Sequence, residues 1–168
     1  METRASGQPS PVSLASPRFV MGKDQQDVIA AVRAEDLVAL QKLLARPKGK
    51  SSKIGLGSVK KFNVNAQDDD GLTPLHHAAL SGNVRIISLL LESGAIVNIP
   101  DKKGLDPLHY AAWQGYMDPV GLLLSGGADA NAQSGETRDT PLHLAAQHGH
   151  YDVVSLLVQH RVGRCCMW

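Results

Sequence analysis

The chain has 168 residues and a net charge of +1, but the charge is unevenly divided: residues 1–66 hold 11 basic and 5 acidic side chains, whereas residues 67–168 hold 6 and 11. Sequence-independent binding to nucleic acid needs a basic face across the folded domain, so the acidic second part argues against that function. No apolar run reaches the roughly 18 residues that span a bilayer, and the first residues lack the apolar stretch of a secretory signal, so we expect a cytoplasmic protein.

Residues 1–22 form an N-terminal extension that we expect to be disordered. They are rich in Ser and Pro and show no sustained hydrophobic period. Helical spacing of apolar residues begins at residue 24 and continues to residue 44, for example at Val28 and Leu40. We therefore predict helices here and assign residues 23–66 to a degenerate first structural repeat, because terminal repeats of an array diverge where they meet water.

A basic insertion, residues 46–62, lengthens this first repeat. It contains six Lys and Arg residues and no acidic residue. Two interpretations remain open. The insertion is either a solvated flexible loop or a contact for an acidic partner or an anionic lipid surface. Each basic residue near an anionic lipid surface contributes about 1 kcal/mol to the binding free energy. The lysines that would make such a contact are Lys48, Lys50, Lys53, Lys60 and Lys61.

One phrase then occurs three times. The copies read TPLHHAALSG from Thr73, DPLHYAAWQG from Asp106 and TPLHLAAQHG from Thr140, and their prolines are separated by 33 and then 34 residues. A fixed period of this length with a TPLH-like core is typical of ankyrin repeats. We assign three further repeats to residues 67–99, 100–132 and 133–160.

Each phrase also has the chemistry of a short helix. Thr or Asp stands at the N-cap, proline follows at the first helical position, and glycine ends the segment. A second apolar helix follows each phrase, as at Val84 to Leu91. The sequence therefore predicts an all-α ankyrin solenoid of about four repeats, with short β-hairpins connecting them.

A few positions depart from this pattern. Glu35 takes, in the first repeat, the position that Gly82 occupies in the second. Arg138 replaces, in the fourth repeat, the glycine found at Gly104. Gly121 lies inside the second helix of the third repeat, where it should cost about 1 kcal/mol relative to alanine. We expect that helix to be the least stable of the set.

The repeat pattern stops after His160, and we assign residues 161–168 to a non-repeat tail. The terminal CCMW fits a CaaX frame with Cys165 as a lipid acceptor, although Trp168 is a poor final residue; a chance ending is the alternative. Two adjacent cysteines without further ligands do not make a zinc site.

The histidines of the repeated phrase invite a metal or catalytic interpretation. We instead expect His76, His109 and His143 to brace the turns through hydrogen bonds between repeats. The sequence contains no HExxH, no phosphate-binding glycine loop and no recognisable set of nucleophile, base and orienting group. We predict no enzymatic activity and no bound cofactor or metal.

Binding is the remaining function, and the repeat predicts its place. Loop tips and the exposed end of each inner helix line the concave face, which no other part of the fold covers. The predicted protein-binding residues are Asp69, Asp70, Leu72, Leu80, Ser81, Lys102, Lys103, Leu105, Trp113, Gln114, Gln147 and His148. Trp113 is either an exposed hot spot or a side chain half buried against the neighbouring inner helix.

Residues 21–160 resemble the N-terminal ankyrin region of the Caskin family, scaffold proteins associated with the synaptic kinase-like protein CASK. The resemblance lies in MGKDQQ from Met21, LGSVKKFNVNAQDDDG from Leu56 within the basic insertion, HYAAWQG from His109 and PLHLAAQHGHYDV from Pro141. It implies a protein partner. The CASK-binding segment of the family lies beyond the repeats, so we do not expect this chain to bind CASK directly.

Three hypotheses of function follow. The first is a non-enzymatic Caskin-like scaffold or adaptor, present as a fragment or a short isoform, that binds a protein on its concave face. The second is a stand-alone ankyrin regulator that inhibits an enzyme such as a kinase. The third is a peripheral membrane adaptor that uses the basic insertion.

Overall fold

The structure is a computed structural model that describes residues 23–45, 63–135 and 137–165. The N-terminal extension and the basic insertion lie outside these residues. Within them the chain forms eight helices and no β-strand: α1 (Lys23–Arg33), α2 (Leu37–Leu44), α3 (Pro74–Ser81), α4 (Val84–Glu92), α5 (Pro107–Gln114), α6 (Met117–Ser125), α7 (Pro141–Gln147) and α8 (Tyr151–Cys165). The predicted all-α repeat fold is confirmed.

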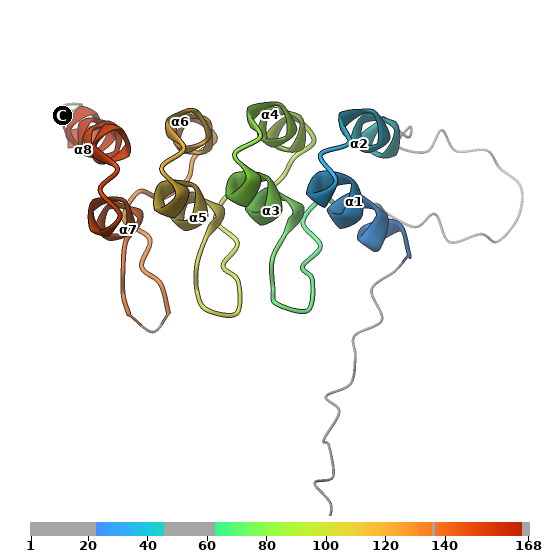
Figure 1. Ribbon diagram of the computed structural model, residues 1–168, viewed down its shortest axis with the longest axis horizontal. Helices are drawn as coiled ribbons and strands as arrows, with labels where there is room; N and C mark the ends of the chain where they lie inside the picture. The colour runs from blue at the N-terminus through green and yellow to red at the C-terminus, as the bar shows by residue number, and fades with distance from the viewer. Residues whose placement is uncertain (1–22, 46–62, 136, 166–168) are drawn as a thin grey trace, which may run out of the picture.

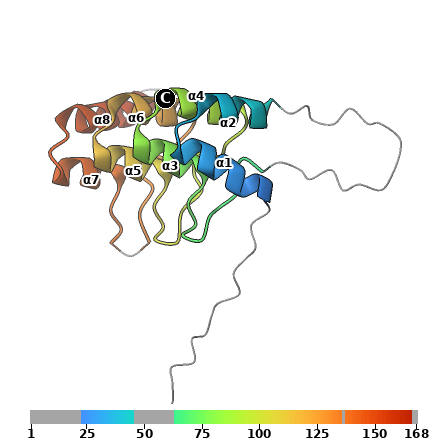
Figure 2. The same ribbon diagram turned by 45° about the vertical axis from the view of Figure 1, so that its right-hand side comes forward.

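The helices form two layers (Figure 1). The inner layer contains α1, α3, α5 and α7, and the outer layer contains α2, α4, α6 and α8. Long loops leave the inner layer on one side of the molecule, before α3, α5 and α7 (Figure 2). Each inner helix packs against the next inner helix and against its own outer helix, so the core continues from repeat to repeat.

Small side chains allow the inner helices to approach each other. Ala78, Ala79, Ala111 and Ala112 are completely buried where α3 and α5 meet. Leu90 and its equivalents in the other outer helices fill the space between the layers. The alanine pairs of the repeated phrase are thus explained by packing.

A histidine caps the start of α3, α5 and α7. The backbone N–H of Thr73 donates to His76 Nδ1 at 3.0 Å, and that of Asp106 donates to His109 Nδ1 at 3.0 Å. Because Nδ1 accepts a hydrogen, the ring proton lies on Nε2, which donates to the next repeat. His76 Nε2 reaches the Leu105 carbonyl at 3.0 Å. His109 Nε2 reaches the carbonyls of Ala132, at the end of its own repeat, and of Asp139, in the fourth repeat, both at 3.1 Å. The predicted bracing role is confirmed for both residues.

The loops between repeats are turns that carboxylates hold in place. Asp101 Oδ1 accepts the backbone N–H groups of Lys103 and Leu105, both at 2.8 Å, and the Asp101 N–H donates to the Leu105 carbonyl at 3.0 Å. Asp68 makes the same arrangement one repeat earlier. The carboxylate takes N–H groups that a β-ladder would pair, so the predicted β-hairpins are not confirmed in the described loops.

Two non-glycine residues adopt the left-handed conformation that glycine adopts elsewhere in the array. Glu35 has φ 54° and Arg138 has φ 57°, whereas Gly82 and Gly104 have φ 72° and 77°. Both substitutions recognised in the sequence therefore keep the backbone of the repeat.

The last outer helix is longer than the repeat pattern indicated. Helix α8 continues through Cys165, so residues 161–165 extend this helix where we expected a tail. Helix formation does not need the repeat pattern, and these five residues contain no proline to stop the helix.

Candidate interaction surface

The predicted binding residues lie on the inner layer in two groups. Two loops carry Asp69, Asp70, Leu72, Lys102, Lys103 and Leu105, and the C-terminal ends of α3, α5 and α7 carry Leu80, Ser81, Trp113, Gln114, Gln147 and His148. All twelve side chains are exposed or partly exposed. We call this set of residues the inner face.

Trp113 is the largest exposed side chain of the inner face. It is 43% exposed, and its ring centroid lies 6.3 Å from that of Tyr110 and 5.9 Å from that of His148. His150 Nε2 donates to the Trp113 carbonyl at 2.9 Å and so connects the end of α5 to the fourth repeat. Trp113 is therefore held between neighbouring aromatic rings while much of its surface remains open to solvent.

Tyr110 and His77 also lie on the inner layer, although we did not predict them as site residues. The Tyr110 hydroxyl donates to Asp101 Oδ2 at 2.7 Å, and His77 Nε2 lies 2.9 Å from Asp68 Oδ2. Burial and the Asp101 carboxylate raise the pKa of Tyr110, which therefore remains a donor. Both occupy the position directly after TPLH or DPLH, where the residue differs between copies of the phrase. This variation was the sequence signal that could have identified them as site residues.

Hydrogen bonds between neighbouring loops hold the charged tips of the inner face. The Lys102 N–H donates to the Asp70 carbonyl at 3.2 Å, and the Lys102 ammonium donates to the Asp69 carbonyl. The Gly135 N–H donates to the Lys103 carbonyl at 2.9 Å. A partner would therefore meet a largely pre-formed surface, which reduces the entropy lost on binding.

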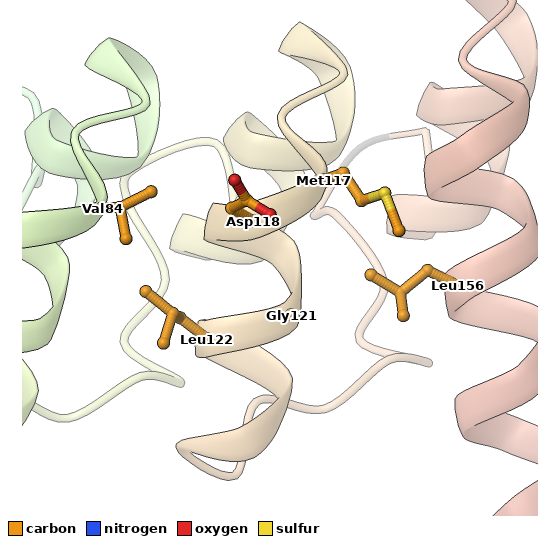
Figure 3. A pocket seen from close by; sticks show the side chains of 6 residues that line it. All are labelled: Val84, Met117, Asp118, Gly121, Leu122 and Leu156. Carbon is orange, nitrogen blue, oxygen red and sulfur yellow. The ribbon is translucent and has the colours of Figure 1, made fainter.

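A separate hollow lies on the outer layer, away from the predicted residues. It is open and mostly apolar, has a volume of about 410 Å³, and is lined by Val84, Met117, Asp118, Gly121, Leu122 and Leu156. In Figure 3, Met117 and Leu156 point toward each other on one side of α6, and Val84 and Leu122 face each other on the other side. Asp118 is the one charged residue of this lining.

The described part of the chain holds neither a cluster of metal ligands nor a helix that could span a membrane. Within residues 23–45, 63–135 and 137–165, no three His, Cys, Asp or Glu side chains gather as a metal-ligand set. No helix in those ranges is both long and apolar enough to cross a bilayer. The five lysines predicted to contact an acidic or lipid surface, and the Cys165 side chain, lie outside the described part.

Comparison with known families now assigns the repeats. A family model of ankyrin repeats in three copies matches residues 28–134, and a model of one ankyrin repeat matches residues 137–166. The chain belongs to the ankyrin-repeat family. The second match includes residues 161–165, in agreement with the extended helix α8.

Several curated proteins are similar to part of this ankyrin chain. Caskin-1 of Rattus norvegicus is 56% identical over 77 residues, 46% of this chain and 5% of that protein. Caskin-2 of Homo sapiens is 52% identical over 77 residues, 46% of this chain and 6% of that protein. Ankyrin repeat and sterile alpha motif domain-containing protein 1B of Danio rerio is 40% identical over 81 residues, 43% of this chain and 6% of that protein.

The predicted resemblance to the Caskin family is confirmed by the first two of these matches. The chain spans only about one twentieth of the length of these curated relatives. The repeats of this chain are Caskin-like.

Proposed function

We propose that the chain is a non-enzymatic, cytoplasmic protein-interaction module, a Caskin-like scaffold or adaptor that holds a protein partner on its inner face. Ankyrin repeats and Caskin relatives support this class of function. Trp113 is the observation that carries the assignment to the inner face. Partly exposed tryptophan in the middle of a surface is typical of a binding hot spot.

The internal repeats show that the fold does not need tryptophan at this position. Leu80 and Gln147 take the same place in the first and third copies of the phrase. Trp113 therefore adds exposed aromatic area that the architecture does not require. The neighbouring Tyr110 and His148 rings limit its motion, so little side-chain entropy would be lost when a partner covers it.

The partner of this surface is a protein and not a nucleic acid. The described loops present both acidic and basic tips, for example Asp70 and Lys103, and do not form a continuous basic face. No direct contact with CASK is proposed.

Selection of peptides from a random displayed library on the full chain tests this proposal. The selected peptides should lose at least tenfold in affinity when Trp113→Ala and Leu105→Ala are introduced together. Ile96→Ala is the matched control, because Ile96 is an exposed apolar residue outside the inner face. Urea unfolding of each variant shows whether the fold is intact. Binding that survives the double substitution would show that the inner face is not the site.

A further inference from the structure

Exposed apolar side chains gather at the turns that join the inner helices to the outer helices. Among the described residues, nine large hydrophobic side chains are exposed, and six of them lie at three successive turns: Leu80, Val84, Trp113, Tyr116, Met117 and Tyr151. Tyr151 is 85% exposed and Met117 is 51% exposed. We call these six residues the turn edge; Trp113 belongs to both this edge and the inner face.

Contacts between repeats make the turn edge continuous. The ring of Tyr116 lies against Gly82 so closely that a Cβ there would be 2.8 Å from it. His150 lies against Gly115 in the same way, at 2.4 Å. Tyr116 and His150 therefore connect the exposed apolar side chains of three successive repeats, and gathered exposed apolar surface marks interaction sites.

The hollow on the outer layer, which we call the outer hollow, extends the turn edge. The packing of the fold does not explain why this hollow exists. Val84 and Met117 belong to both (Figure 3). Its floor is Gly121, whereas the matching outer-helix residues are Ser88 and Ser155. A Cβ at Gly121 would lie 3.9 Å from Leu156 Cδ2, an ordinary contact, so packing does not demand glycine there, although glycine weakens a helix.

Charges follow the edge in a fixed order. Arg85, Asp118 and Asp152 stand at matching positions of α4, α6 and α8, and all three are exposed. In the described part of the chain, none of them forms an ion pair. A partner that lies along the edge meets one positive charge and then two negative charges, one from each repeat.

The spacing fits an α-helix. Neighbouring packed helices are about 8 to 10 Å apart, and seven residues of an α-helix rise about 10.5 Å. One heptad of a partner helix thus corresponds to one repeat of this chain. Beyond the binding proposed for the inner face, we infer that the turn edge binds an amphipathic helix of a protein partner. The helix lies across the second to fourth repeats, with one apolar side chain in the outer hollow.

Charge complementarity sets the remaining chemistry of this helix. It carries an acidic residue opposite Arg85 and basic residues opposite Asp118 and Asp152, one heptad apart. Opposite charges at the rim of an interface set the orientation of the partner and reject those with the reverse order.

The test is selection on the full chain from a displayed library of 21-residue helices. Apolar residues are fixed at heptad positions a and d, and Glu, Lys or Ser are allowed at the flanking positions. Selected helices should carry Lys in two adjacent heptads and Glu in the third. Gly121→Leu, which fills the hollow, and Met117→Ser should each weaken binding at least tenfold. Asp118→Lys with Asp152→Lys should replace both selected Lys by Glu, so that all three heptads carry Glu.

Controls separate this inference from the proposed function. Val38→Ser changes an exposed apolar residue of α2 and should leave helix binding unchanged. Urea unfolding shows which variants are folded. If Gly121→Leu does not fold, Met117→Ser still tests helix binding, because Met117 is largely exposed. If no helix is selected, if charge order is random, or if binding responds only to Trp113→Ala with Leu105→Ala, the inference fails. In the last case the proposed function stands.

Discussion

Replacing Asp106 with threonine should stabilise the chain, and the gain should depend on pH. Asp106 caps α5 but is only 8% exposed, whereas threonine occupies the same position at Thr73 and Thr140. Burial, followed by the charges of Asp129 and Asp101, raises the pKa of Asp106 from 3.8 to about 6. The structure thus keeps a carboxylate where two other repeats have a neutral hydroxyl.

The size of the gain follows from that pKa. The difference between 3.8 and about 6 corresponds to at most about 3 kcal/mol. Solvent screening of a partly accessible carboxylate and the partial positive charge at the helix N-terminus both reduce this value. We expect Asp106→Thr to raise the free energy of unfolding by about 1 to 2 kcal/mol at pH 7.5.

The sign with pH is equally specific. The folded chain holds the Asp106 proton up to about pH 6, whereas the unfolded chain releases it near pH 3.8. Ionisation therefore costs stability as pH rises through this range, with the full cost above about pH 6. The advantage of Asp106→Thr, measured by urea unfolding, should be complete at pH 7.5 and largely lost by pH 4.

A converse substitution controls for changes in packing. Thr73→Asp places a carboxylate at the matching, buried N-cap of α3 and should lower the free energy of unfolding at pH 7.5. If Asp106→Thr gives the same gain at pH 4 and pH 7.5, or no gain at pH 7.5, buried charge is not the cause and the reasoning is refuted.

Three further predictions concern stability. Gly121→Ala should raise the free energy of unfolding by about 0.5 to 1 kcal/mol, since its Cβ meets nothing within 3.9 Å. Gly104→Ala should lower the free energy of unfolding by about 2 kcal/mol or more, because φ is +77° and the Cβ would lie 2.4 Å from a backbone nitrogen. Gly127→Ala should lower it by less, because Gly127 has φ +93° but its Cβ would meet open space. Burial lowers the pKa of His76 and His109 below 6.5, so their contribution to stability should be complete above about pH 6.5 and decline at lower pH. Urea unfolding at several pH values checks all three, and stability that rises on acidification from pH 6.5 in Asp106→Thr would contradict the last.

The fold could be predicted from the sequence because the repeated phrase contains its own local chemistry. Proline, the N-cap residue, histidine and glycine determine where each inner helix begins and ends, and these signals act within ten residues. Even Glu35 and Arg138, which break the pattern, keep the left-handed backbone of the glycines they replace. Repeat position thus predicted backbone conformation better than residue type did.

Two features could not be predicted in this way. The β-hairpins were expected from the family pattern, but the Asp101 carboxylate accepts the N–H groups that would form the ladder. Residues 161–168 were assigned to a tail because the repeat pattern stops after His160, yet α8 continues through Cys165, since a helix ends where capping or proline stops it.

The candidate surfaces were only partly visible in the sequence. The inner-face residues could be predicted because loop tips and helix ends are exposed in any such array. The turn edge was missed because Val84, Met117 and Tyr151 are ordinary when taken singly and lie one repeat apart. These residues form one surface only when the stacking of successive repeats brings them to the same side of the array.

Gly121 connects the stability of the array to the inferred binding of a helix. If the hollow is only a packing defect, alanine at this position should stabilise the chain and affect nothing else. If the hollow receives a side chain, alanine should stabilise the fold and weaken helix binding modestly, and leucine should abolish binding because it occupies the volume. A graded loss of binding from glycine to alanine to leucine, with folding retained, is therefore the result that distinguishes a binding site from a defect.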